Sequence, residues 1–280
     1  MTVQLAERPA PLTAFAPRPV WAVGPSHPGL RGDENAALQG GHWFAGLSAP
    51  LRHAILGSAV VRHVAAGDVL ARRGDTHANW VGVVRGAARL GASLSDGRDF
   101  TLDFIGPGQW FGDIALIDDQ ASELDMVAHV ASTLLVVTQA DLRRLIATHD
   151  ELRDAFLQLN CQRLRHVYRR FEELHSLTLA QRLARQILRL AHRFGRPMAA
   201  GLSIDLPVSQ GDLAAMVGGS RQRVNGAWRQ MCQLGIVEFA RSRLVVCDEA
   251  RLSAAADGRI VLSGVGTAAP RTTQLVPAAL

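Results

Sequence analysis

The spacing of hydrophobic residues changes along the chain, and each spacing predicts a different kind of structure. Between about residues 43 and 137, short apolar runs are interrupted by Gly-Asp and Gly-Pro-Gly turn signals. Examples are WVGVVRGAARL at 80–90, FTLDFIG at 100–106 and TLLVV at 133–137. Short strands at this spacing, with no helices between them, predict an antiparallel barrel or roll.

A long helix is predicted next, over residues 150–176. One stripe recurs at steps of three and four residues and consists of Leu157, Asn160, Leu164, Val167, Phe171 and Leu174. This spacing is typical of a dimeric coiled-coil seam, in which Asn160 would fix the register. The stripe covers only about two and a half heptads, so packing against the roll of the same chain is the alternative. Four arginines lie off the stripe and predict that the other side of the helix is solvated: Arg163, Arg165, Arg169 and Arg170.

Two short helices with a tight turn between them are predicted after a helix at 179–193. Ser209, followed by Asp212 three residues later, is typical of a capping box at a helix start. Gly218 and Gly219 end that helix, and Ser220 caps the next one. In the second helix, a buried face is predicted from the i, i+3, i+4, i+7 spacing of Val224, Ala227, Trp228 and Met231.

The opposite face of the second helix carries arginine and amide side chains, namely Arg221, Gln222, Arg223, Asn225 and Arg229. Arginine bonds guanine O6 and N7 bidentately, and Asn and Gln match adenine N6 and N7. The helix starts at Ser209 and Ser220 would offer backbone N–H groups to phosphate. VEFARSRLVV at 237–246 predicts a hairpin, with Arg241 and Arg243 at its tip to contact the DNA backbone. The pattern therefore predicts a DNA-recognition helix with a wing, and the alternative is a helical hairpin with a solvated basic face.

Charge is distributed unevenly between the two halves of the chain. All 30 basic residues are arginine, whose planar fork suits phosphate and guanine. Residues 41–150 hold nine arginines and twelve acidic residues, whereas residues 177–251 hold eleven arginines and five acidic residues. This asymmetry favours a separate sensor and a domain that binds a polyanion.

Several classes of protein are disfavoured by what the sequence lacks. Cys161, Cys232 and Cys247 are too widely separated for a metal cluster or a disulfide framework and are expected to be incidental thiols. No nucleophile–base pair, metal-ligand spacing or phosphate-binding loop is evident, so we expect no enzyme, no cofactor and no metal. The sequence shows neither a run of about 20 apolar residues nor a secretory signal, which predicts a cytoplasmic protein without membrane contact.

The two ends of the chain differ from the rest in composition and in hydrophobic pattern. Residues 1–40 are rich in Pro, Ala and Gly, without apolar periodicity, and predict a disordered arm. The predicted organisation is an arm at 1–40, a sensor domain at 41–149, a dimerisation helix at 150–176, a DNA-binding domain at 177–255 and a flexible tail at 256–280.

Six segments resemble the Crp/Fnr family of bacterial transcription regulators over about residues 43–252. They are QRLARQILRLA (181–191), SQGDLAAMVGGSRQRVN (209–225), LGIVEF (234–239), AAGDVLARRGD (65–75), GVVRGAARL (82–90) and IGPGQWFGDIAL (105–116). The resemblance implies an α+β fold with an eight-stranded, jelly-roll-like cyclic-nucleotide-binding roll, a long dimerisation helix and a C-terminal winged helix-turn-helix. It also implies a homodimer on palindromic double-stranded DNA, with RNA polymerase as a further partner.

The effector site of that family is degenerate in this sequence. Members that bind cyclic nucleotides carry F-G-E, whose Glu holds the ribose, and R-[ST]-A, whose Arg neutralises the phosphate. Here the first motif reads Phe111-Gly112-Asp113 and the second reads Glu123-Leu124-Asp125. Two carboxylates in place of the phosphate's cation predict that cyclic AMP is not the effector, because an unpaired buried charge costs several kcal/mol. The residues expected to face the base are Val167 and Tyr168.

Other effectors stay open at this point. All three cysteines lie at or beyond Cys161, which disfavours the N-terminal iron–sulfur cluster of some members. The roll contains His42, His53, His63 and His77, so a haem-bearing variant is a weaker alternative. The roll either senses an unknown effector or serves as a dimer scaffold. The runner-up function is a nucleotide- or small-molecule-sensing module that acts on a protein partner.

Overall fold

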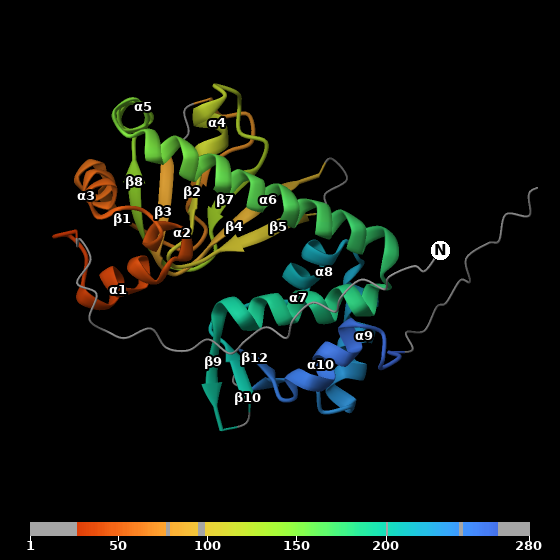
Figure 1. Cartoon of the computed structure of the whole chain (residues 1–280). Helices are drawn as coiled ribbons and strands as arrows, with labels where there is room; N and C mark the ends of the chain where they lie inside the picture. Colours follow the sequence, from red (N-terminus) through yellow and green to blue (C-terminus); the bar gives the residue numbers. More distant parts are fainter. Residues whose placement is uncertain (1–26, 77–78, 95–98, 200, 241–242, 263–280) are drawn as a thin grey trace, which may run out of the picture.

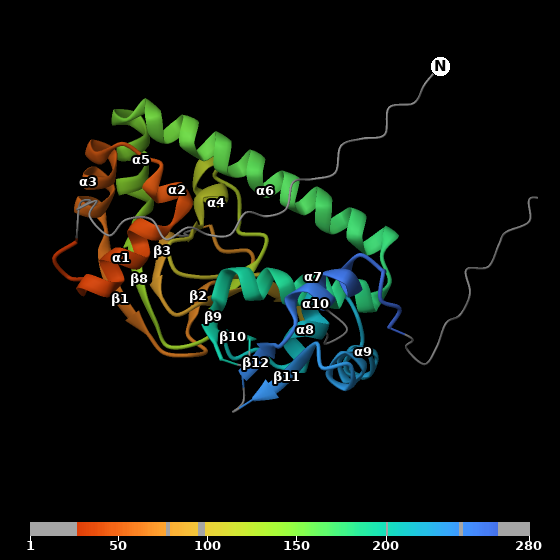
Figure 2. The ribbon, with the colours of Figure 1, turned by 60° about the horizontal axis from the view of Figure 1, so that its bottom comes forward.

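The computed structural model describes residues 27–76, 79–94, 99–199, 201–240 and 243–262. An N-terminal β-roll and a C-terminal domain are joined by one long helix, α6 (Asp150–Ser176), which runs past both of them (Figures 1 and 2). Within the described residues, no helix combines the length and the apolar content needed to span a bilayer.

The roll consists of two four-stranded antiparallel sheets, as predicted. The first has the order β1 (Val60–Val64), β8 (Ser132–Val137), β3 (Trp80–Arg85) and β6 (Trp110–Phe111). The second has the order β2 (Val69–Ala71), β7 (Asp125–Ala128), β4 (Ala88–Ser93) and β5 (Asp99–Ile105). The interior is filled by apolar side chains, including Val81, Val83, Ala88, Ile105, Phe111, Met126 and Leu134.

An aromatic cluster fastens the first half of α6 to the roll. It contains Trp43 and Phe44 of α2 (His42–Ala45), Trp80, Trp110 and Phe156 of α6. The ring centroids of Trp80 and Trp110 lie 4.3 Å apart, and Trp43 stacks on Phe156 at 5.7 Å. Aromatic pairs at these distances add to the stabilisation from buried area. The helices α3 (Ala49–Ser58) and α5 (Gln139–Thr148) complete this side of the roll.

The prediction of a disordered arm over the whole of 1–40 is wrong for its last part, because α1 (Gly32–Gly40) is a helix packed on the roll. Leu38 is fully buried, and the buried Glu34 carboxylate accepts a hydrogen bond of 2.9 Å from Thr133 Oγ1. Arg85 Nε lies 3.3 Å from the same carboxylate oxygen of Glu34. Contacts with distant residues hold this helix, and such contacts leave no periodicity in the local sequence. Residues 1–26 lie outside the described residues.

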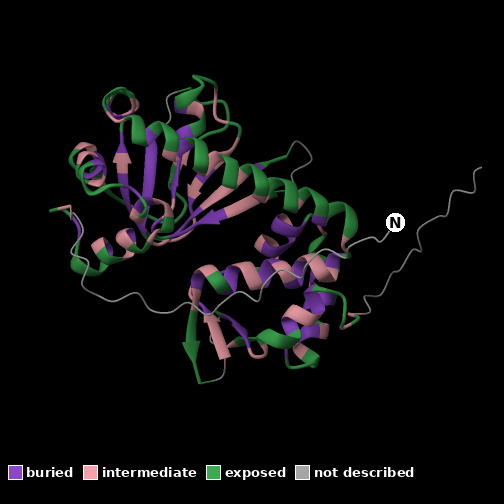
Figure 3. Ribbon diagram, in the orientation of Figure 1, coloured by how far each residue is buried: buried purple, intermediate pink, exposed green. Residues whose placement is uncertain are grey.

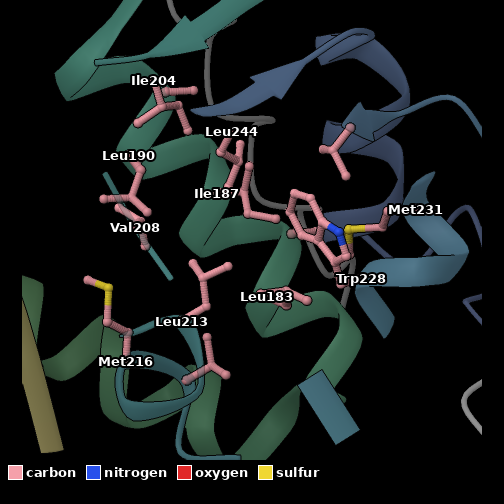
Figure 4. Packing of buried hydrophobic residues seen from close by; sticks show 14 of the residues in the cluster. Leu183, Ile187, Leu190, Ile204, Val208, Leu213, Met216, Trp228, Met231 and Leu244 are labelled. Carbon is pink, nitrogen blue, oxygen red and sulfur yellow. The ribbon is translucent and has the colours of Figure 1, made fainter. Parts of the chain in front are cut away.

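The C-terminal domain packs four helices on a four-stranded sheet. Its helices are α7 (Leu179–Phe194), α8 (Gln210–Val217), α9 (Arg221–Gln233) and α10 (Glu249–Ala256). The sheet has the order β11 (Val237–Ala240), β12 (Arg243–Val246), β10 (Gly201–Ile204) and β9 (Gly195–Met198). The sequence predicted the hairpin of β11 and β12 but not β9 and β10. Figure 4 shows the core between the helices, where Leu183 and Ile187 of α7 lie near Leu213, Trp228 and Met231.

The prediction of a flexible tail at 256–280 can be compared with the structure only up to residue 262. The backbone N–H of Arg259 donates to Ala254 O, and Ile260 and Leu262 pack against the core of the C-terminal domain. The tail prediction is therefore wrong for residues 257–262, and residues 263–280 lie outside the described residues.

Candidate nucleic-acid interface and sensor site

Caps at both helix starts and a glycine between them set the geometry of α8 and α9. Ser209 Oγ accepts from Asp212 N at 3.1 Å, and Asp212 Oδ2 accepts from Ser209 N at 2.8 Å, which is the predicted capping box. Gly218 ends α8 in the left-handed conformation, with φ of 65°, which other residues rarely adopt. Ser220 Oγ then caps α9 by accepting from Arg223 N at 3.4 Å.

The two faces of α9 are buried and exposed as the sequence predicted. Its inner face is buried in the core through Val224, Ala227, Trp228 and Met231. Its outer face exposes Arg221, Gln222, Arg223 and Arg229, with Asn225 half-buried beside them. None of these arginines forms an ion pair within the part of the chain that the structure describes. The row of unpaired guanidinium and amide groups matches the hydrogen-bonding edges of a DNA major groove.

The wing differs from the prediction in the surroundings of its basic residues. Arg243 pairs with Asp205, which also pairs with Arg196 Nε at 2.8 Å. Arg243 is thus a half-exposed member of a bridge between β12 and the end of β10, and not an isolated phosphate contact. No local pattern pointed to this bridge, because β9 and β10 were not predicted from the sequence. Arg241 lies outside the described residues.

Arg182 of α7 links two helix ends next to the recognition segment, and sequence reasoning missed it. Its Nε donates to Val217 O at 3.0 Å, and its Nη1 donates to Leu177 O at 2.9 Å and approaches Leu174 O at 3.5 Å. Burial, followed by repulsion from Arg223, lowers the pKa of Arg182. A single guanidinium therefore holds the carboxyl ends of both α6 and α8, where the backbone carbonyls favour a cation.

Asp113 occupies the predicted effector position, but the protein's own cation neutralises it. Asp113 is fully buried at the start of α4 (Asp113–Ile117), and Arg163 Nη1 donates to both of its carboxylate oxygens at 2.7 Å. Asn160 Nδ2 donates to Asp113 Oδ2 at 3.1 Å, and Arg163 also donates to Trp110 O. Gly112 precedes this carboxylate and has a φ of 89°, which favours glycine. A Cβ at this position would also clash with the backbone oxygen of Asn79, so a larger residue would displace Asp113. Side chains of α6 thus already neutralise the Asp113 carboxylate and supply its hydrogen bonds.

Within the described residues, the other side chains predicted for the effector pocket make no hydrogen bond to Asp113. Asp125 Oδ1 instead accepts from the backbone N–H of Arg73 at 2.9 Å. Glu123 is exposed, and Leu124 is half-buried. Val167 and Tyr168 are 44% and 63% exposed on α6. The hydrogen-bond partners of Asp113 are therefore Asn160 and Arg163. From the sequence, Asn160 was predicted to lie in the dimer seam and Arg163 on the solvated side of the helix.

Most of the predicted seam on α6 is exposed in the single chain (Figure 3). The five apolar members are between 44% and 66% exposed: Leu157, Leu164, Val167, Phe171 and Leu174. Asn160 differs, because its amide is bound to Asp113 and is not free to fix a dimer register. The expectation that the arginines off the stripe are solvated is wrong for Arg163, which pairs with Asp113, and for Arg170, which donates to Gln186 and to Met216 O.

Comparison with known proteins supports both halves of this description. The family model of the cyclic nucleotide-binding domain matches residues 61–149, and that of the Crp-like helix-turn-helix domain matches residues 181–255. A CRP-like cAMP-activated global transcriptional regulator of Mycobacterium tuberculosis is 26% identical over 171 residues, which cover 61% of this chain and 76% of the relative. A global nitrogen regulator of Synechococcus elongatus is 24% identical, over 61% of this chain and 78% of the relative.

A solved structure shows the same fold. The crystal structure of a transcriptional regulator of the CRP/FNR family from Thermus thermophilus covers 71% of this chain and 98% of its own, with a TM-score of 0.61 and 24% identity. The two domain matches, the helix-turn-helix geometry and these relatives agree, and the chain belongs to the Crp/Fnr family of transcription regulators.

Proposed function

We propose that this protein is a cytoplasmic homodimer that reads palindromic double-stranded DNA through α9 and regulates transcription. The observation that carries the proposal is the outer face of α9, where arginine and amide side chains stand exposed around a fully packed helix-turn-helix core. A rigid core fixes the direction of these side chains, which base-edge recognition requires. RNA polymerase is the further partner that a regulator of this family implies.

The exposed stripe of α6 supports the homodimer. Five large apolar side chains at seam spacing would remain in water in a single chain, although an apolar stripe of this kind is normally buried. Two copies joined along α6 would place two α9 helices about a two-fold axis. Such a pair reads two half-sites about one helical turn apart.

We expect that cyclic AMP does not control the protein. Asp113 is bound by Arg163 and Asn160, and the positions that match the family's phosphate-binding motif carry Glu123 and Asp125 in place of a cation. Isothermal titration calorimetry of the full-length protein with cyclic AMP should therefore give no binding heat at micromolar ligand. Micromolar affinity would contradict this part of the proposal.

Replacing Arg221 with alanine should cost about 1–3 kcal/mol of affinity for a specific site and relax the preference at one base pair. The reason is that Arg221 begins α9, where side chains reach base edges, and it carries no internal ion pair in the described residues. The site is first defined by selecting bound sequences from random oligonucleotides, and affinities are then measured for the selected and scrambled duplexes.

Arg243→Ala is the matched comparison on the wing. It should weaken both duplexes alike and reduce the slope of log affinity against log salt by at most about one, because Arg243 has to exchange its pair with Asp205 for a phosphate. If Arg221→Ala weakens both duplexes equally, α9 is not the reader and the interface is only a nonspecific basic surface.

A further inference from the structure

A second basic region lies between α6 and α7, away from both the roll interior and the outer face of α9. His166 and Arg170 of α6 are one helical turn apart, and α7 contributes Arg185, Arg189 and Arg193 at successive turns. The acidic residues among them are Glu173 of α6 and Asp103 of β5. In Figures 1 and 2, α7 runs beside the second half of α6. Arg193 lies in the last turn of α7 and pairs with Asp103 of β5 at 2.8 Å.

Two guanidinium groups of this arginine cluster share one neutral acceptor. Gln186 Oε1 accepts from Arg170 Nη1, and also from Arg189 Nε at 3.1 Å and Arg189 Nη2 at 3.0 Å. Gln186 is only 2% exposed, so this contact lies out of water. Two cations held against a single amide oxygen repel each other, and an amide carries no net charge to offset that repulsion.

The cluster as a whole has more positive than negative charge. Among the residues that the structure describes, Arg185, Arg189 and Arg193 pair with two carboxylates, those of Glu173 and Asp103, and Glu173 Oε1 is shared between Arg189 at 2.9 Å and Arg185 at 3.4 Å.

The electrostatics of individual groups show the same imbalance. Burial, followed by repulsion from Arg189, lowers the pKa of Arg170 to about 10, although Glu173 and Asp103 oppose the change. Burial also lowers the pKa of His166; the charge of Asp103 opposes this change, and the charges of Arg170, Arg189 and Arg193 add to it.

We propose that the arginine cluster between α6 and α7 binds a small, multiply charged oxyanion of the diphosphate class through Arg170, Arg185, Arg189 and Arg193. Their planar forks suit paired phosphate oxygens. Solvent reaches the cluster, because the side chains of Arg185, Arg189 and Arg193 are 37%, 26% and 27% exposed. An anion held here would connect the long helix to the first helix of the DNA-binding domain, outside the degenerate effector site of the roll.

The test is isothermal titration calorimetry of the full-length protein with inorganic pyrophosphate, in the absence of DNA. Wild-type protein should bind pyrophosphate, and Arg189→Gln should lower the affinity by about ten- to a hundredfold, the effect of losing a pair of charge-assisted hydrogen bonds. Gln186→Glu should lower it similarly, because an internal carboxylate then occupies the place of the anion. The same variant should melt at a higher temperature without pyrophosphate, so its loss of binding cannot be attributed to unfolding.

Two controls distinguish binding at this arginine cluster from binding at other basic surfaces. Arg165→Gln changes an exposed arginine of the same helix and should leave the pyrophosphate affinity at the wild-type value. Arg221→Ala removes a cation of the DNA-reading face and should also leave it unchanged. Absence of binding to the wild type at millimolar pyrophosphate would overturn the proposal. Binding that survives Gln186→Glu, or that is lost in Arg221→Ala and kept in Arg189→Gln, would overturn it as well. Because no DNA is present, these outcomes are independent of the proposed DNA recognition.

Discussion

Replacing Arg163 with leucine will lower the free energy of unfolding of the roll by about 3–5 kcal/mol, the usual cost of leaving a buried charge without its partner. Asp113 is fully buried, and Arg163 bonds both of its oxygens. The Arg163 side chain is itself 30% exposed, so we expect the lower end of this range. Urea unfolding of the full-length protein at a fixed concentration, followed by tryptophan fluorescence, measures the change, because Trp80 and Trp110 lie in the roll.

The control and the double variant identify the cause. Arg165→Leu, two positions further along α6 and exposed, should change the stability by less than about 0.5 kcal/mol. Asp113→Ala combined with Arg163→Leu should recover much of the loss, because no charge is then left unpaired. Equal losses in Arg163→Leu and Arg165→Leu would show that the pair with Asp113 contributes nothing.

We expect the replacement of Leu164 with aspartate to convert the proposed dimer to a monomer and to reduce affinity for a palindromic site by about a hundredfold or more. A carboxylate in a closed apolar seam loses its hydration, and two separate chains lose the gain from binding both half-sites together. Light scattering should give twice the chain mass of 30.1 kDa for the wild type and the single mass for the variant.

Gln162→Asp is the matched control, because Gln162 is exposed on the same helix but lies off the stripe, beside the hollow lined by His42 and Trp43. It should stay dimeric. A wild-type protein that is a monomer and still binds palindromic DNA tightly would contradict the proposed dimer, as would a fully dimeric Leu164→Asp variant.

Local patterns in the sequence were enough to predict the recognition segment. The buried face of α9, the capping box of Ser209 and the turn at Gly218 all depend on residues within one or two helical turns. The strands of the roll were recognisable because glycine turns separate short apolar runs. In each case, the physical cause and the visible pattern lie in the same short stretch of chain.

The partners of polar residues could not be predicted in the same way. Arg163 lies 50 positions from Asp113, and Arg170 lies 16 positions from Gln186. Spacing shows that such arginines are off an apolar stripe, but it cannot distinguish a solvated arginine from one that neutralises a buried acid. Asn160 was assigned to the seam for the same reason. The helix α1 escaped prediction because Leu38 and Glu34 are held by tertiary contacts, without an amphipathic repeat.

The contacts of Arg182 have a mechanical consequence. The end of α6 and the end of α8 are attached to one side chain, a few residues before α9 begins. In the proposed dimer joined along α6, we expect a displacement of the last turn of α6 to move the start of α9 with it. A change along the long helix would then alter the distance between the two α9 helices, and with it the spacing of the half-sites that they can read.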